Sequence, residues 1–86
     1  MEKRSFIAIV EQIVAGFEEP SFAQQWSAAQ ASGDVPAMMA LPAAIQNAAF
    51  AAHGCPDSAA FKAAGKSYAL DPAVGPLLVR MKAALK

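Results

Sequence analysis

The sequence predicts an all-α protein, a compact bundle of four to five helices in a single domain over residues 1–86. About a quarter of the residues are alanine, the best intrinsic helix former, and β-branched residues are scarce. Apolar residues recur at spacings of three and four in several segments, which is the period of an amphipathic helix. Proline, glycine and acidic residues divide these segments where helices would end and start.

The stretch from Val35 to Gly54 lies in the longest run without a charge and is predicted to be the central helix of the bundle. Alanines spread apolar surface around most of it, and one stripe at helical spacing consists of Met38, Leu41, Ile45, Ala48 and Ala52. A helix that is apolar almost all round is usually buried by neighbours on several sides. Asp34 is expected to cap this helix. Pro42 is expected to kink it near Met38, because an internal proline removes a hydrogen bond and clashes with the carbonyl four residues earlier.

Two helices are expected before the central one. The first should begin between Glu2 and Ser5 and end near Phe17, and it carries the clearest amphipathic series of the chain: Phe6, Ile9, Val10, Ile13, Val14 and Phe17. The second should run from Ser21 to Ala31, with Ser21 starting a capping box and glutamines on its wet side. It is the most polar of the predicted helices.

Two further helices are expected after the central one. Gly54 should supply the C-cap of the central helix, and a fourth helix should run from residues 57–58 to Tyr68. Asp71 followed by Pro72 is the pattern of a cap and a first-turn proline, so it predicts the start of the last helix. The firm part of that helix could begin only near Pro76, because a Gly-Pro pair loosens the first turn.

The charge balance excludes several classes of partner. The chain has seven basic and seven acidic residues, so no basic field attracts a nucleic-acid backbone or an anionic membrane. We find no run of about 20 apolar residues free of breakers, as a membrane span needs. The single cysteine cannot form an internal disulfide, which fits a reducing compartment. We therefore expect a cytoplasmic protein without a membrane or nucleic-acid partner.

The inventory of reactive groups does not predict an enzyme. Five of the acidic residues stand at predicted helix starts, where capping explains them: Glu18, Glu19, Asp34, Asp57 and Asp71. His53 and Cys55 flank a glycine, but a catalytic dyad needs a third group to orient the base. One histidine and one cysteine are also too few for a metal site within the chain. We expect no catalytic residue, no metal and no cofactor, and rank an enzyme that uses this pair as the last hypothesis.

Surplus apolar surface on the central helix indicates a protein-interaction module. The candidate partner surface consists of Met38, Met39, Ala49 and Phe50. Two adjacent methionines point about 100° apart on a helix, so both cannot face one core wall. The partner is an unidentified protein, and a second copy of the chain is one candidate for it. The alternative hypothesis is a small carrier of an apolar ligand, with a pocket between the kinked central helix and the first and last helices.

A set of short motifs in a fixed order resembles the protein C-ten family, small uncharacterised helical proteins of eukaryotes. The resemblance spans the chain from about Ile9 to Leu85, and its most specific parts are Leu41-Pro42, Ile45-Gln46, Gly54, Phe61, Lys66-Ser67-Tyr68, Asp71-Pro72 and Lys82. His53 stands where the family pattern has an aromatic residue. The resemblance implies an intracellular helical protein without a catalytic motif, and the vertebrate members are associated with brain development.

Overall fold

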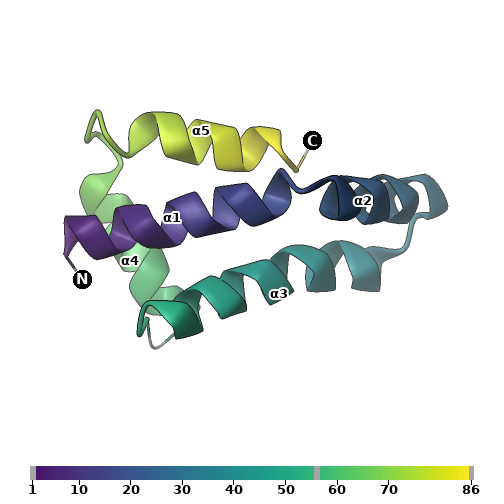
Figure 1. The fold of residues 1–86 in the computed structure, drawn as a ribbon, viewed down its shortest axis with the longest axis horizontal. Helices are drawn as coiled ribbons and strands as arrows, with labels where there is room; N and C mark the ends of the chain where they lie inside the picture. The colour runs from purple at the N-terminus through teal and green to yellow at the C-terminus, as the bar shows by residue number, and fades with distance from the viewer. Residues whose placement is uncertain (1, 56, 86) are drawn as a thin grey trace.

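The computed structural model describes residues 2–55 and 57–85, and these residues form five α-helices and no strand (Figure 1). The helices in chain order are α1 (Lys3–Phe17), α2 (Pro20–Ser32), α3 (Val35–Ala52), α4 (Ser58–Tyr68) and α5 (Gly75–Ala83). The prediction of an all-α bundle is confirmed.

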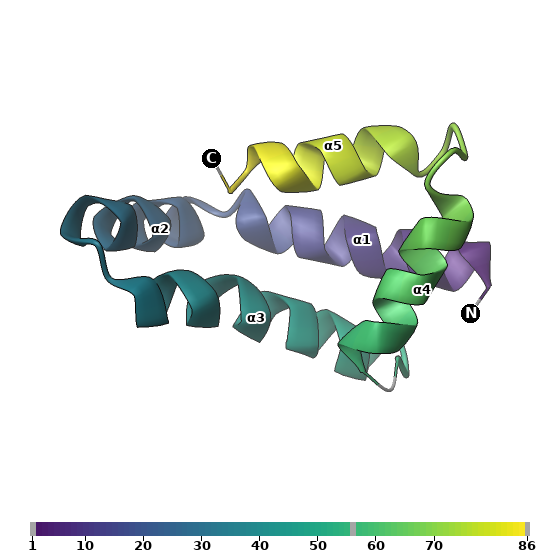
Figure 2. The ribbon, with the colours of Figure 1, turned by 180° about the vertical axis from the view of Figure 1, so that it is seen from behind.

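The helix at the centre of the bundle is α1. It packs against each of the other four helices, with α3 along one side, α5 along another and α4 crossing near its N-terminal end (Figures 1 and 2). Every residue of the apolar series predicted from the sequence is buried, namely Phe6, Ile9, Val10, Ile13, Val14 and Phe17. The amphipathic pattern of this helix was therefore a reliable guide to its inner face.

The prediction that α3 is the central helix is wrong. This helix packs mainly against α1 and α2, and only Ala49 and Phe50 of its residues are buried. Most of the apolar positions of α3 are alanines, which gain little hydrophobic free energy from burial because their side chains are small. The aromatic and branched side chains of α1 gain more, and they occupy the interior instead.

Carboxylates cap two helices at the predicted positions. The backbone N–H of Ala37 donates to Asp34 Oδ1 at 3.2 Å, and the N–H of Ala60 donates to Asp57 Oδ1 at 2.9 Å. Gly54 follows the end of α3 with a φ of 69°, the left-handed conformation that a residue after a helix C-terminus commonly takes. These ends of α3 and α4 were predictable because each depends on a local motif.

Two predicted helix starts differ from the structure. The first residue of α2 is Pro20, one position before the predicted start, and Ser21 makes no capping hydrogen bond. Asp71 accepts a hydrogen bond from the N–H of Ala73 at 2.8 Å within a turn, so the start predicted at Asp71 is wrong, and α5 begins at Gly75, next to Pro76, where its firm part was expected. The prolines define both starts, since a proline is tolerated in a first turn where its missing N–H has no partner to lose.

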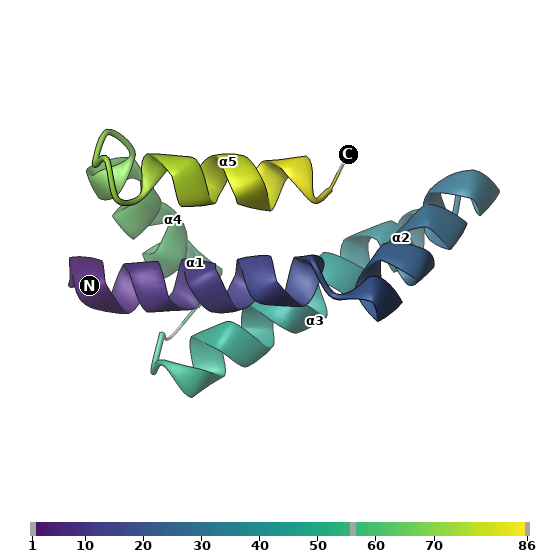
Figure 3. The same ribbon diagram turned by 45° about the horizontal axis from the view of Figure 1, so that its top comes forward.

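The molecule is elongated, with principal extents of 39 × 25 × 19 Å. In Figure 3, α2 lies beyond the C-terminal end of α1 and away from α4, with α3 beside it. We call α2, α3 and their connection the α2–α3 hairpin (20–52). Within it α3 continues without a break through Pro42, so the expected kink stays a prediction.

Candidate functional site

The α2–α3 hairpin is almost free of charge. Between Pro20 and Ala52 the sequence has one charged residue, Asp34, which lies in the connection between the two helices. The connection is tight because Gly33 adopts a φ of 66°, and Asp34 N–H donates back to the carbonyl of Ala29 at 2.9 Å. All the other charged side chains stand on α1, α4, α5 or the segments next to them. The hairpin is therefore the part of the molecule with the fewest charges.

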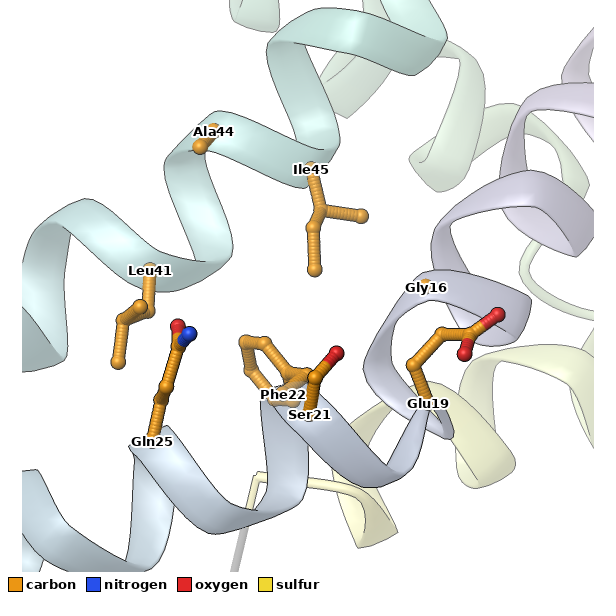
Figure 4. A pocket seen from close by; sticks show the side chains of 8 residues that line it. All are labelled: Gly16, Glu19, Ser21, Phe22, Gln25, Leu41, Ala44 and Ile45. Atoms are coloured by element: carbon orange, nitrogen blue, oxygen red, sulfur yellow. The ribbon is translucent and has the colours of Figure 1, made fainter.

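A groove follows the hairpin between α2 and α3. It consists of two adjoining cavities of about 310 and 320 Å³, which share Gln25 and Leu41 as lining residues. The first cavity is also lined by Gly16, Glu19, Ser21, Phe22, Ala44 and Ile45 (Figure 4). The second is also lined by Ala28, Ala29, Ser32, Asp34 and Ala37. We call these residues together the α2–α3 groove.

The floor of the groove is built on the aromatic core. Phe22 is buried, and its ring stacks on Phe17 of α1 at 5.1 Å between centroids and on Trp26 at 6.0 Å. In Figure 4, Phe22 and Ile45 point into the space between the two helices. Stacked rings fix one another, so the floor is a preformed apolar surface.

A glycine brings α1 close to α3 at this point. A Cβ atom built on Gly16 would lie 2.7 Å from Cγ2 of Ile45, closer than real Cβ contacts allow. The missing side chain lets Ile45 sit directly on the backbone of α1, as Figure 4 illustrates with Gly16 beside the cavity. Gly16 therefore holds the groove against the central helix.

The two ends of the groove carry carboxylates. Glu19 lines the cavity at the start of α2, and Asp34 lines the cavity at the helix connection. Neither residue makes an ion pair within the part of the chain that the structure describes. The neighbouring Glu18 is different, since its Oε1 accepts a hydrogen bond from Arg80 at 2.7 Å. The groove is thus uncharged in the middle and anionic at both ends.

The partner surface predicted from the sequence does not exist as one surface. Ala49 is fully buried, and Phe50 is buried with its ring 5.2 Å from that of Phe61, so neither can contact a partner. Met38 is half-buried against the core, and Met39 is 72% exposed. The sequence could not show that Phe61 of α4 covers Phe50 near the end of α3.

Met39 is also remote from the groove. Residues two positions apart point about 200° apart on a helix, so Met39 and Leu41 lie on opposite sides of α3. Sequence reasoning missed Gln25 and Ala44, which line the groove. The available indication was that the uncharged run of α3 is preceded by an uncharged second helix, so that two adjacent helices lack charge together.

His53 and Cys55 have separate partners. A ring nitrogen of His53 lies 3.0 Å from Oε1 of Gln12, and the buried thiol of Cys55 donates to the carbonyl of Asp57 at 3.3 Å. Neither hydrogen bond joins the two side chains to each other. Among the described residues, no group of three His, Cys, Asp or Glu side chains is arranged to hold a metal ion.

A third cavity of about 420 Å³ lies where α5 approaches the end of α1. It is lined by Phe17, Glu18, Ala23, Arg80, Ala83 and Ala84. The Glu18–Arg80 ion pair lies in this lining, and the cavity is an open depression like those of the groove. An apolar-ligand pocket was expected between α3, α1 and α5, and α3 does not contribute to this cavity.

A comparison with protein-family models finds no matching family, and searches of the curated proteins and of the solved structures find no match. The resemblance to the protein C-ten family therefore stays a prediction from the order of its short motifs. The expectation that the chain has no membrane span stays a prediction: within the described part of the chain, α3 is long and apolar enough for one by length and composition, with a mean hydropathy of 1.3 over 18 residues, a test that core helices of soluble proteins also pass. The same helix packs on α1 and α2 through Leu41 and Ile45.

Proposed function

We propose that the chain is a non-enzymatic protein-interaction module that binds a helix of a partner protein in the α2–α3 groove. The observation that carries this proposal is the groove itself, an apolar trough that follows an uncharged helical hairpin. Amphipathic helices bind to grooves of this kind through apolar side chains at helical spacing. Depletion of charged residues is also the compositional mark of the centre of a protein interface.

The amount of exposed surface supports the same proposal. The accessible surface is 5317 Å², whereas a folded monomer of 8.9 kDa is expected to have about 4,800 Å². A partner helix that lies along α2 would contact three to four turns of α2, because the 13 residues of α2 extend about 20 Å.

The test is capture of the partner with charged variants of the tagged full chain, expressed in its own cells. Ala44 lines the groove and is exposed, so Ala44→Glu places a charge where the partner helix would lie without disturbing the core. The proposal predicts that a stoichiometric partner is lost with Ala44→Glu. The matched control is Ala63→Glu on the exposed side of α4, which should retain the partner.

A third variant tests whether the partner binds in the groove or at the outer side of α3, where the sequence predicted part of the surface. Met39→Glu changes the opposite side of α3 and should also retain the partner if the groove is the binding site. Loss of the partner with Met39→Glu alone would contradict the proposal and assign binding to the outer side of α3. Circular dichroism of the three variants should match that of the parent chain, since all three positions are exposed.

The alternative function is a carrier of a small apolar ligand. The first cavity of the groove has a volume of about 310 Å³, at the lower limit of the roughly 300–1,000 Å³ of ligand pockets. Native mass spectrometry of the purified chain tests this alternative, which predicts a co-purifying small molecule. The resemblance supports a cytoplasmic, eukaryotic setting and a role in development for either function.

A further inference from the structure

We infer that the helix bound in the α2–α3 groove has an uncharged apolar face flanked by one basic residue or a pair of basic residues at each end. This inference rests on the proposed function and specifies the partner's chemistry. It follows from the distribution of charge along the groove, which has carboxylates at both ends and none between them.

The two carboxylates can act as separate binding points, and Oδ1 of Asp34 also caps α3 by accepting from the N–H of Ala37. Glu19 lies just before the first residue of α2, and Asp34 lies two positions after the last one. The length of α2 places them about 20 Å apart, well beyond the screening length of about 8 Å at physiological salt. A partner helix that lies along the groove therefore needs basic residues about 13 to 15 positions apart.

The middle of the groove determines which side chains the partner helix can have between its basic residues. Its floor is Phe22, Leu41 and Ile45, and its nearby polar groups are the uncharged side chains of Ser21 and Gln25. A charged side chain placed here would lose water without gaining an opposite charge, which is unfavourable. Leucine and alanine side chains on the partner helix fit the floor, and Gln25 at the rim can form hydrogen bonds.

A second copy of this chain does not meet the charge requirement. If two hairpins packed face to face around a two-fold axis across the helices, Glu19 of each copy would approach Asp34 of the other. If the axis ran along the helices, each carboxylate would approach its own equivalent. Both arrangements place like charges together. The described helices also lack basic residues at the required spacing, since the two basic residues in each of α1, α4 and α5 are one, four and two positions apart.

A lipid surface is disfavoured for the same reason. Cytoplasmic membrane surfaces are anionic and attract clusters of lysine and arginine, and the α2–α3 hairpin has neither. The polar side of α2 also contains three glutamines, which do not belong in a hydrocarbon layer: Gln24, Gln25 and Gln30. A basic-flanked protein helix is the occupant that the charges favour.

The experiment uses the full chain and two designed peptides as probes. Each peptide is a 16-residue helix with a leucine–alanine face, and it has either two lysines or two glutamates at each end. Amide chemical shifts of the labelled protein are followed during titration. The lysine peptide should shift the amides of residues 22–29, 37–41 and 43–45, and it should bind about five- to tenfold more tightly than the glutamate peptide at low salt.

A charge-neutral variant tests the origin of that preference. Glu19→Gln together with Asp34→Asn removes both carboxylates, and asparagine still caps α3. The variant should bind the two peptides with equal affinity. Equal binding of both peptides by the unaltered chain would overturn the inference and leave the groove as a helix-binding site.

Two other results would overturn the inference in favour of another occupant. One is a dimer in light scattering that Ala44→Glu dissociates, and the other is binding to phosphatidylcholine–phosphatidylserine vesicles without a response to either peptide. The absence of any peptide response would also overturn it. The proposed function is judged separately, by whether Ala44→Glu loses the partner captured from cells.

Discussion

The two most apolar helices of this protein have opposite roles. In α1, large side chains form one stripe, and six of them are buried between the other helices. In α3, alanines and methionines cover the circumference, and two residues are buried. The comparison teaches that the size and arrangement of apolar side chains decide which helix becomes the centre, whereas apolar content alone does not.

The contrast also predicts different effects for substitutions in the two helices. Because α1 is surrounded, its substitutions should act on stability. The α2–α3 hairpin is packed against the bundle on one side, so many of its surface positions should act on binding.

The largest expected effect is the loss of a fully buried side chain from α1. Ile13 has no exposed surface, so Ile13→Ala should lower the free energy of unfolding by about 2–5 kcal/mol. The matched change in α3, Met39→Ala, should alter it by less than about 0.5 kcal/mol because this side chain is exposed. Urea denaturation measures both, and equal losses would show that α3 is as buried as α1.

An intermediate effect is expected where α1 meets α3. Gly16→Ala should destabilise the fold by about 1–2 kcal/mol, because the new methyl group meets the stiff branched side chain of Ile45. Gly65→Ala is the control, since a Cβ there would find ordinary contacts with Phe6 at 3.7 and 3.9 Å. This control should stabilise α4 by about 0.5–1 kcal/mol through higher helix propensity. Thermal unfolding distinguishes the two, and a tolerated Gly16→Ala would mean that α3 can move away from α1.

The smallest expected effect concerns an ion pair at the periphery. Two contacts lower the pKa of Asp71 below its ordinary value. The larger effect comes from the hydrogen bond donated by the Ala73 N–H, and the smaller from the Lys3 ammonium, 3.0 Å from the carboxylate. Because the folded-state pKa is the lower one, this carboxylate stabilises the fold above the unfolded-state pKa, and the contribution is lost as pH falls through the folded-state pKa.

Asp71→Asn measures this contribution. The variant should lower the Tm by about 1–2 °C near pH 7, since exposed ion pairs contribute little. The difference in Tm between the two proteins should disappear below the folded-state pKa of Asp71, where the carboxyl is protonated. A difference that persists unchanged at low pH would assign the effect of the substitution to lost turn geometry.

The sequence was sufficient for features that depend on neighbouring residues. The stripe of α1 has the helical period, and its buried residues were all predicted. The caps at Asp34 and Asp57 follow from side chains that bond the backbone three positions later. The turn at Asp71 was harder, because the same Asp-Pro pattern suits both a helix start and the turn that precedes α5.

The candidate site could not be predicted because it depends on packing between segments. Phe50 looks like part of an exposed apolar surface until α4 covers it with Phe61. The groove needs α2 beside α3, and α3 is held against α1 by the close approach of Ile45 to Gly16, which is 29 positions away in the sequence. The lack of charge across both helices was visible in the sequence, but its meaning became clear only when they proved to be neighbours.

The central claim is that the groove side of α3 contacts a partner while α1 holds the fold together. Its most direct test places a photo-crosslinking phenylalanine derivative at position 44 of the tagged chain in its own cells, with the same group at position 63 as a control. The account predicts a discrete covalent adduct with one partner protein from position 44 and none from position 63. Adducts from position 63 without any from position 44 would contradict it.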